Sequence, residues 1–592
     1  MERLTIFFAL FAEVLHQERH FFRLILYGIL FFVPQLLIGQ GISIGSGAYI
    51  TASGSSLITI SSGNFENNGT YTKDTETITM SGTTAATVTG TSTTVNNLTI
   101  SNTGGVTNQQ SLLTVNNTLT IESGAKLTVA SSKALTVNGT TQVNATEGLV
   151  IATEGSFLDN GTINYISGSA KAEHYLTGSR WWYIGSPMTA ATALAFGTLS
   201  SVANTGTRLF YWSEPSNGYT AITSTSTTLN PLQGYAYKKS DGAQTASFTG
   251  SLNTGTIGTD NNLDWTTGLS HDGFNLVSNP YPSAIDWDAA SGWTKTNIEN
   301  NIWYRTNSTY ATYNGTSKEG VNGGQKYIPA LQAYWVHVPD LYADKGTLKV
   351  NNSTRLHNSQ AFYKASSVNN VFRMIVRRDT LNDEMLVGFY PSALATYEDF
   401  DAEKMFSTDN DHPQITTLTS EHIEVAINGQ PELAPNEIRT IPLGFLTKVS
   451  GDFTFEATNL DELDPAISVY LEDLMGIKQL DLRASNTYSF YSAPASGDER
   501  FRLHFGKSSV NAEPTPADNG IRIFANDLTV NLYLPADLPG TLEVFTVLGQ
   551  RILQRPLEPG FTQLYLNVDK GLYIFRIQVN HTLTTKKLFL GK

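Results

Sequence analysis

Short runs in which apolar and polar residues alternate predict β-strands along most of the chain, because alternation gives a strand one apolar face. Between positions 41 and 165 the runs are apolar–Thr–apolar triplets separated by turn-forming residues. They are Leu98-Thr99-Ile100, Leu113-Thr114-Val115, Leu119-Thr120-Ile121, Leu127-Thr128-Val129 and Leu135-Thr136-Val137. Strands this short cannot bury their apolar faces alone and must stack on neighbouring repeats. We therefore predict a β-solenoid over residues 41–165.

Two spacings indicate repetition in this region. The last three triplets start eight residues apart, and the segment Phe65–Thr70 is echoed by Phe157–Thr162. The composition is unusual, since 23 of the 60 residues from 81 to 140 are Ser or Thr and only three are charged. A low-complexity, partly disordered stalk is the alternative, but the strict alternation argues against it.

The region 166–360 has a different composition and contains all eight tryptophans of the chain. It also matches itself in three ordered places, which predicts two related β-units. Trp182–Pro187 resembles Phe274–Pro280 and Leu209–Trp212 resembles Asn301–Tyr304, both at an offset of 92, and Leu232–Tyr235 resembles Leu331–Tyr334 at an offset of 99. The tryptophans either fill two sandwich cores or offer aromatic faces on which sugar rings stack. Core packing is the favoured interpretation, and no individual glycan contact can be assigned.

Further strands and a linker complete the predicted organisation. Alternating stretches at 372–376, 453–455 and 501–505 predict a β-sandwich over residues 361–506. Residues 507–519 contain Pro and Ala in a pattern typical of a linker, and residues 520–592 are again rich in strands. The fold class is therefore all-β: a solenoid, sandwich-like domains and a small terminal domain.

The first 39 residues are the only membrane-seeking part of the sequence. The predominantly apolar run of 15 residues from Leu24 to Ile38 follows Arg23 and is short for a spanning helix, which needs about 20. We expect a signal peptide cleaved between Gly39 and Gln40, with a single-helix anchor as the alternative. The long segment before Arg23 suggests a start codon placed too far upstream.

Charge and cysteine content narrow the function classes. The chain of 592 residues has 38 Lys and Arg against 52 Asp and Glu, so its net charge is −14. An acidic protein with 15% charged residues is a poor nucleic-acid binder, because such binding needs clustered cations. The absence of cysteine excludes thiolate metal sites, cysteine nucleophiles and disulfides, and suits an exported protein.

No motif predicts a catalytic site or a cofactor. Gly41–Gly45 matches Gly-x-Ser-x-Gly, and Ser123–Lys126 matches Ser-x-x-Lys, but neither stands in the strand–turn–helix context that its chemistry needs. The acidic stretches Asp409–His412 and Asp461–Asp464 lack the spacing of a calcium loop and are equally well explained as solvated turns. We therefore expect neither enzyme activity nor a cofactor.

The C-terminal 75 or so residues resemble a known family, the type A sorting domain of proteins exported by the type IX secretion system. The resemblance rests on Val544–Gln550, Asp569–Ile577 and the basic closing strand Thr585–Leu590. It implies sorting-signal roles for Gly549, Gly571, Tyr573, Lys586 and Lys587 and an immunoglobulin-like fold. The sequence departs from the family at 524–527, where Phe-Ala-Asn-Asp replaces the usual Pro-Asn-Pro.

The resemblance also implies a location and a partner. Such domains are read by the outer-membrane translocon of the type IX system and are then typically cleaved, and the passenger is attached to surface lipopolysaccharide or released. We expect an extracellular or surface protein whose passenger is a non-catalytic adhesin that contacts extracellular glycans. The alternative is a secreted polysaccharide-degrading enzyme with two carboxylates in a site that the sequence does not reveal.

Overall fold

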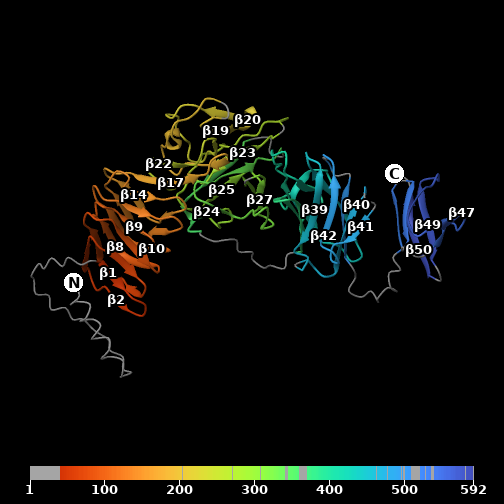
Figure 1. The fold of residues 1–592 in the computed structure, drawn as a ribbon, viewed down its shortest axis with the longest axis horizontal. Helices are drawn as coiled ribbons and strands as arrows, with labels where there is room; N and C mark the ends of the chain where they lie inside the picture. The colour runs from red at the N-terminus through yellow and green to blue at the C-terminus, as the bar shows by residue number, and fades with distance from the viewer. Residues whose placement is uncertain are drawn as a thin grey trace, which may run out of the picture. The chain divides into compact units, whose positions relative to one another are not determined.

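The computed structural model of the chain consists almost entirely of β-strands (Figure 1). It describes residues 41–358, 370–507 and 521–590, apart from positions 203–204, 270, 307, 341–344, 462, 476–477, 495–496, 498–499, 527, 535–538 and 580–581. The predicted signal peptide with Gly39 and Gln40, and the predicted linker beyond residue 507, lie outside the described residues. The chain divides into two compact units, one within residues 1–364 and the other within 365–592. The all-β prediction is confirmed.

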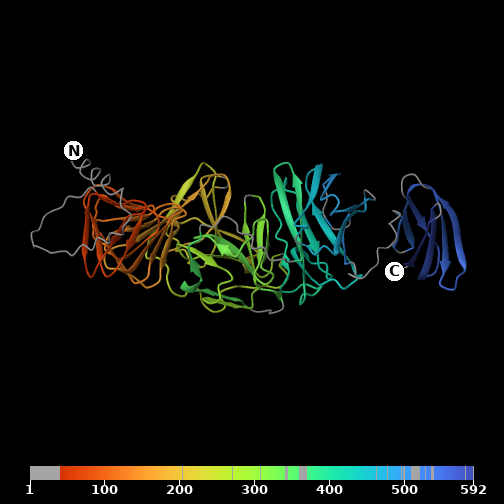
Figure 2. The same cartoon turned by 90° about the horizontal axis from the view of Figure 1, so that it is seen from below.

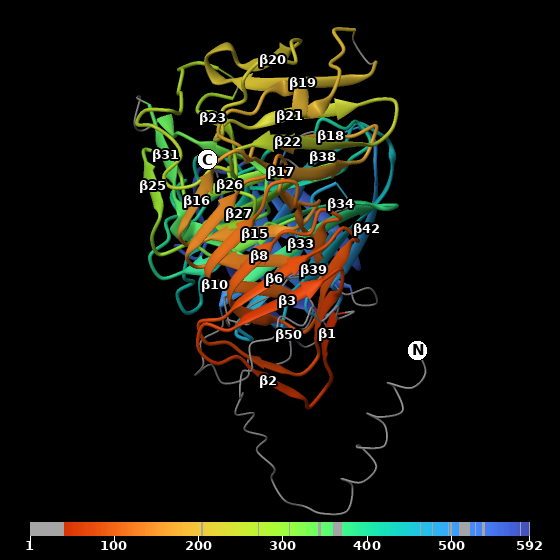
Figure 3. The ribbon, with the colours of Figure 1, turned by 90° about the vertical axis from the view of Figure 1, so that its left-hand side faces the viewer.

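The predicted solenoid is confirmed, with about six turns of stacked parallel strands (Figure 3). One sheet contains β1 (Gly41–Ile44), β4 (Asn64–Asn67), β7 (Ala86–Gly90), β9 (Val106–Asn108), β11 (Leu127–Val129), β14 (Leu149–Ile151) and β17 (Ala170–Leu176). The other contains β3 (Leu57–Ser61), β6 (Thr77–Ser81), β8 (Thr93–Ile100), β10 (Leu112–Ile121), β12 (Ala134–Val137), β15 (Ser156–Asp159), β13 (Thr140–Val143) and β16 (Thr162–Tyr165), while β2 (Tyr49–Thr51) and β5 (Thr70–Thr72) pair separately.

The stacking period differs from the spacing of the triplets. Leu113 lies beside Leu135 and Leu127 beside Leu149, so a coil here is 22 residues long (135 − 113 and 149 − 127). The eight-residue spacing separates successive strands that belong to different sheets. The echo between Phe65 and Phe157 likewise joins β4 of one sheet to β15 of the other. It therefore reflects a shared local pattern of a strand followed by Asn-Gly, not equivalent positions in the coil.

A strand from the Trp-rich region ends the solenoid. β22 (Gln244–Gly250) pairs antiparallel with β17 and covers the edge that a further coil would otherwise occupy. Covering this edge prevents uncontrolled strand addition. One apolar core runs without a break from Ile44 in the first coil to Phe248 and Leu252, past position 165.

The two related units of the Trp-rich region have the same strand order. The first sheet is β18 (Trp181–Ile184), β21 (Tyr235–Lys239), β19 (Thr207–Ser213) and β20 (Gly218–Ile222). The second is β23 (Phe274–Ser278), β30 (Ala333–His337), β26 (Asn301–Arg305), β27 (Tyr310–Asn314) and β28 (Glu319–Val321). The short 3-10 helices Ala193–Phe196, Glu214–Ser216 and Asn352–Thr354 lie in the connections.

Strand register moves two of the three sequence matches by one residue. Tyr235 lies opposite Ile184, whereas its counterpart Tyr334 lies opposite Val277. Ile184 therefore corresponds to Val277, at an offset of 93 (277 − 184) in place of 92. The pairing of β19 with β21, compared with that of β26 with β30, gives the same offset. Equivalent positions in the two units follow from this register.

The two units contact each other reciprocally, as halves related by an approximate two-fold axis do. Four of the backbone contacts between the units form two pairs, in each of which the second contact is the reverse of the first. The pairs are the β-bridges Ile184–Gln332 and Gln233–Val277, and the N–H to carbonyl bonds Gly185–Leu331 (2.7 Å) and Ser278–Leu232 (2.8 Å). The two copies therefore pack together as one approximately symmetric pair.

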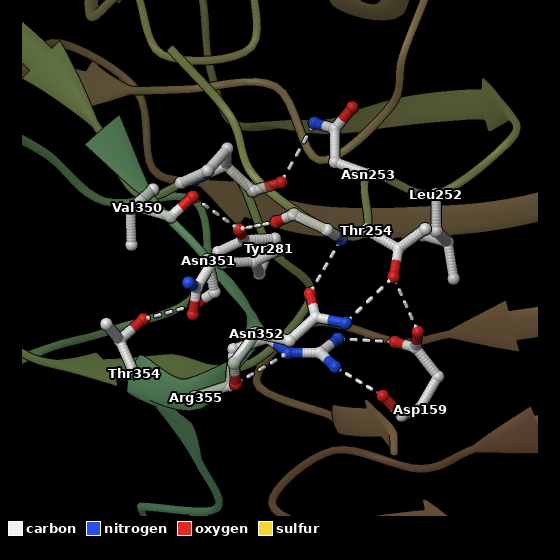
Figure 4. Close-up of polar contacts among 12 residues, drawn as sticks. Asp159, Leu252, Asn253, Thr254, Tyr281, Val350, Asn351, Asn352, Thr354 and Arg355 are labelled. Atoms are coloured by element: carbon white, nitrogen blue, oxygen red, sulfur yellow. Dashed lines mark hydrogen bonds and ion pairs between the residues drawn. The ribbon is translucent and has the colours of Figure 1, made fainter. Parts of the chain in front are cut away.

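A buried ion pair joins the second unit to the last solenoid coil (Figure 4). Arg355, in β32 (Arg355–Leu356), donates to the carboxylate and the carbonyl oxygen of Asp159 in β15. The two side chains are 1% and 2% exposed, so their charges are removed from water and depend on each other. Thr254 donates to the other Asp159 oxygen at 2.8 Å, and Asn352 donates to Thr254 at 3.0 Å. The remaining strands of this unit are β24 (Ala284–Asp286), β25 (Trp293–Thr296), β29 (Tyr327–Ile328) and β31 (Thr347–Val350).

His357 makes a second connection to the solenoid. Its ring nitrogens bond to the hydroxyls of Thr136 at 2.8 Å and Ser156 at 2.7 Å. Burial, and secondarily the charge of Arg355, lower the pKa of His357 to about 4. The ring is therefore neutral in the folded protein at pH values where an unfolded histidine is already protonated.

Acidification is expected to destabilise the compact unit within residues 1–364 through His357. Because the unfolded chain takes up a proton below its pKa of about 6.5 and the folded protein does so only near pH 4, stability is full above pH 6.5 and falls as the pH is lowered towards 4. Between pH 7 and pH 5 the loss should be roughly 1–2 kcal/mol. Denaturant unfolding followed by Trp fluorescence measures it, and His357→Gln should flatten this part of the pH profile. An unchanged profile in that variant would contradict the assignment.

The second compact unit begins with a sandwich-like domain. Its single eleven-stranded sheet contains β33 (Val371–Arg378), β34 (Leu381–Tyr390), β35 (Ala402–Glu403), β36 (Gln414–Leu418), β37 (Glu424–Pro431), β38 (Ile438–Leu446), β39 (Gly451–Thr458), β40 (Ile467–Asp473), β41 (Lys478–Asp481), β42 (Thr487–Ser492) and β43 (Phe501–Lys507). Rings from distant strands meet across one core, as Phe372 and Phe505 do at 5.3 Å. The sheet therefore curls so that two layers face each other. A buried ion pair between Lys404 and Asp383 lies within this domain.

The terminal domain consists of two sheets around a core of its own (blue in Figure 2). The three-stranded sheet is β44 (Arg522–Asn526), β45 (Thr529–Leu534) and β48 (Gly560–Tyr565). The four-stranded sheet is β47 (Arg551–Leu557), β46 (Gly540–Thr546), β49 (Gly571–Val579) and β50 (Thr582–Leu590). Core residues from both sheets pack together, as expected of a small sandwich.

Candidate aromatic and cationic site

Most of the aromatic surface of the Trp-rich region is internal. Trp287, Trp303 and Trp335 are buried, and the other five tryptophans are half-buried. Trp287 packs against Trp293 and Tyr334 inside the second unit. Core packing thus accounts for several tryptophans, and a ligand could contact only those that remain half-exposed.

Trp181 lies on the face of the first sheet that points away from the solenoid core. Side chains alternate between the two faces of a sheet, and Leu209 and Tyr237 fill the core from the opposite face. Trp181 stands opposite Lys238, and Lys238 stands opposite Arg208. Three strands, β18, β21 and β19, therefore place one indole and two cations in a row.

Phe210 completes this group, which we call the Trp181 cluster: Trp181, Arg208, Phe210 and Lys238. The Trp181 ring lies 5.4 Å from the Arg208 guanidinium, 5.5 Å from the Lys238 ammonium and 5.7 Å from the Phe210 ring. Both cations are within the distance at which the π-system of an indole attracts positive charge. All four side chains are half-buried, which leaves part of each accessible.

The other end of the same face is closed by the second unit. Trp212 donates from Nε1 to the carbonyl oxygen of Phe274 at 2.8 Å and packs edge-on against Trp335 at 5.3 Å. Beside them, the hydroxyl of Tyr183 bonds to that of Tyr219 at 2.7 Å, and burial raises the pKa of both tyrosines. These phenols therefore stay neutral and support the cluster without carrying charge.

Three cations in and beside the Trp181 cluster have no acidic partner among the described residues. In the described part of the chain no carboxylate pairs with Arg180, Arg208 or Lys238, and the buried Nε atoms of Arg180 and Arg208 have no hydrogen-bond acceptor. Arg180 stacks over Trp182 at 3.9 Å, and burial together with the charge of Arg305 lowers the pKa of Arg180. Unpaired, partly desolvated guanidinium groups are energetically costly unless an anion satisfies them.

Three of the four equivalent positions in the second unit are buried. Trp181, Arg208, Phe210 and Lys238 correspond to Phe274, Asn301, Trp303 and His337 by strand register. Asn301 is 2%, Trp303 0% and His337 7% exposed, and His337 lies 3.0 Å from the carboxylate of Glu299. One copy of the duplicated site is therefore largely buried, whereas all four residues of the other are half-buried and two of them are cationic.

The residues predicted to form a sorting signal lie together in the terminal domain. Gly549 adopts φ +84° in the turn between β46 and β47, a conformation that favours glycine. Gly571 begins β49, where Tyr573 is buried and donates from its hydroxyl to the carbonyl oxygen of Asp569 at 2.6 Å. Lys586 and Lys587 are exposed neighbours on the edge strand β50, so they point to opposite faces of that strand.

The other sequence candidates form no common site. Gly41 opens β1, a strand followed by a turn and another strand, and Ser123–Lys126 forms a turn between solenoid strands. In the stretch 409–412, Asp409 bonds to Ser407, whereas His412 is buried. Within the described ranges no group of three His, Asp or Glu side chains is arranged to hold a metal ion. No helix among those residues has the length and apolar character needed to cross a membrane.

Sequence patterns alone do not mark Arg208 and Lys238. They lie 30 residues apart (238 − 208) in segments whose alternation predicts strands and nothing more. The duplication carried the only available signal. Once the two copies are aligned by register, charged residues in one copy stand against Asn301 and His337 in the other.

The comparison with protein families matches most of the chain. A family model described as a domain of unknown function (DUF8693) covers residues 83–505, which include most of the solenoid, the Trp-rich region and the sandwich-like domain. The search of curated proteins finds no match.

Proposed function

The chain belongs to the DUF8693 family, whose description assigns no activity, and we propose that it is an exported surface protein whose passenger binds glycans without catalysis. In this proposal the solenoid supports the paired Trp-rich units, and the Trp181 cluster is the contact surface. The terminal domain acts as an address for the type IX translocon. The passenger is then attached to surface lipopolysaccharide or released.

The half-open aromatic face carries the binding part of this proposal. Indole and phenyl faces stack on the apolar faces of sugar rings, and neighbouring polar groups supply direction. Trp181 and Phe210 offer such faces beside Arg208 and Lys238. Support for the export part is the resemblance of residues 544–590 to sorting domains, together with their separate core.

Removing the indole tests the binding surface. Trp181→Ala should weaken glycan binding at least about tenfold, the effect of losing about 1.4 kcal/mol of stacking. Trp293→Phe is the matched control, because Trp293 is also half-buried but belongs to the second unit. Binding is measured on a glycan array with the full chain, and thermal unfolding checks that both variants remain folded.

The same screen distinguishes binding from hydrolysis. If the array glycans are cleaved, the alternative of a polysaccharide-degrading enzyme replaces the proposal. If Trp181→Ala binds as well as the parent protein, the Trp181 cluster is not the contact surface.

A further inference from the structure

We propose that the Trp181 cluster recognises acidic glycans, by pairing Arg208 and Lys238 with the carboxylate or sulfate of a sugar whose ring lies on Trp181. This inference rests on the proposed glycan-binding function and specifies its ligand class. It concerns the anionic group of the sugar, which a neutral glycan lacks.

The first argument is charge balance within the site. The chain as a whole carries a net charge of −14, so acidic partners for surface cations are plentiful. Lys239, the neighbour of Lys238, is paired with Asp241 at 2.5 Å. Arg208 and Lys238 have no such partner in the described residues, although both are half-buried. An anionic ligand would supply the missing charge.

The second argument is hydrogen-bonding capacity. Nε of Arg208 is buried and has no acceptor in the described structure, so the protein does not compensate this side of the guanidinium and only its other nitrogens can reach a ligand. A guanidinium donates through a planar fork that matches two oxygens of a carboxylate or a sulfate. Arg208 and Lys238 are direct cross-strand neighbours, so their donors can converge on one anion.

The third argument is the comparison between the two copies. In the second unit the corresponding side chains are Asn301 and His337, and His337 has Glu299 as an internal partner. That copy therefore carries its own counter-charge, and Asn301 and His337 are buried. The first copy has the same strand order, but no carboxylate among the described residues pairs with its Arg208 or Lys238, which leaves these cations available to a ligand.

The small number of cations in the Trp181 cluster favours an acidic sugar over nucleic acid. A nucleic acid presents a row of phosphates and needs a long basic track, whereas the rest of this protein is acidic. Four residues on three strands match a single sugar ring and its acid group. We therefore infer a local contact with one charged sugar at a time.

Matched pairs of polysaccharides test the proposal with the full chain. Polygalacturonate and its methyl ester differ in the free carboxylate, and dextran sulfate and dextran differ in the sulfate. We expect binding to at least one charged member to exceed that to its neutral counterpart at least tenfold. Raising the salt from 0.1 to 1 M, which shortens the Debye length from about 10 to about 3 Å, should weaken it by a similar factor.

Point variants test whether Arg208 and Lys238 cause the preference for charged glycans. Arg208→Gln and Lys238→Gln should each weaken binding to the charged glycan about tenfold, whereas Arg208→Lys should keep the salt dependence but bind less tightly. Lys239→Gln is the control, because it removes the same charge from the next position of β21, where Lys239 is paired with Asp241.

The outcomes separate the two proposals. Binding to neutral and charged glycans alike, unaffected by Arg208→Gln, would overturn the acidic ligand class and leave glycan binding intact. Equal binding of single-stranded DNA would also overturn it. No binding to any glycan would overturn both the ligand class and the proposed function.

Discussion

Asp159→Asn is expected to destabilise the compact unit within residues 1–364 by about 3–5 kcal/mol, because it leaves the Arg355 charge buried without its counter-ion. The loss includes the hydrogen bond from Thr254, which anchors the same carboxylate. All eight tryptophans lie between residues 181 and 335, so Trp fluorescence during denaturant unfolding reports on this unit alone. Its transition should move to lower denaturant.

Two further variants test whether the uncompensated charge of Arg355 causes this loss of stability. Asp159→Asn combined with Arg355→Met removes both charges and should recover most of the loss, since the uncompensated charge causes it. Asp241→Asn breaks an ion pair whose carboxylate is 64% exposed, so water already solvates the charge and the loss of stability should be far smaller. A shift for Asp159→Asn no larger than that for Asp241→Asn would show that the junction does not depend on this pair.

Deletion of residues 520–592 is expected to abolish surface display while leaving the passenger folded. The core of the terminal domain contains only residues from 521 to 590, and the core of the preceding domain ends at Phe505. Removing the domain therefore takes no side chain out of another core. The truncated protein should accumulate in the periplasm with an unchanged Trp-detected transition. Fractionation of the native host followed by immunoblotting measures this.

The lysines of the last strand provide a finer test. Lys586→Glu with Lys587→Glu should impair display with a change in stability of less than about 0.5 kcal/mol, because both side chains are exposed. Lys126→Glu with Lys133→Glu changes the net charge equally within the solenoid and should have no effect on display. Normal display of the deletion would refute the address role. Surface-attached protein that retains Lys592 in mass spectra would refute the cleavage of the terminal domain but not its role as an address.

The solenoid shows which structural features a local sequence pattern can predict. Alternation is a local property, so triplets such as Leu113-Thr114-Val115 predict strands wherever they occur. Which strands stack depends on the length of the turns between them. The eight-residue spacing therefore suggested repetition correctly, while the 22-residue coil that pairs Leu113 with Leu135 appeared only in the strand register.

The Trp-rich region shows the same limit at the candidate site. Its duplication was visible in the sequence, but two matches were displaced by one residue until the partners of Tyr235 and Tyr334 were known. A shift of one residue moves a side chain to the other face of a sheet. The contrast between half-buried Arg208 and its buried counterpart Asn301 could not be read from either copy alone.

The sequence by itself determined the all-β class, the solenoid and the existence of two related units, because these depend on local alternation and on similarity between segments. Only the tertiary structure decided which strands are neighbours, which copy of the duplicated face is largely buried, and that Arg208 and Lys238 flank Trp181. The physical reason is that burial and charge pairing depend on contacts between residues far apart in the chain. Alternation specifies a face for each side chain but not the surface that the face meets.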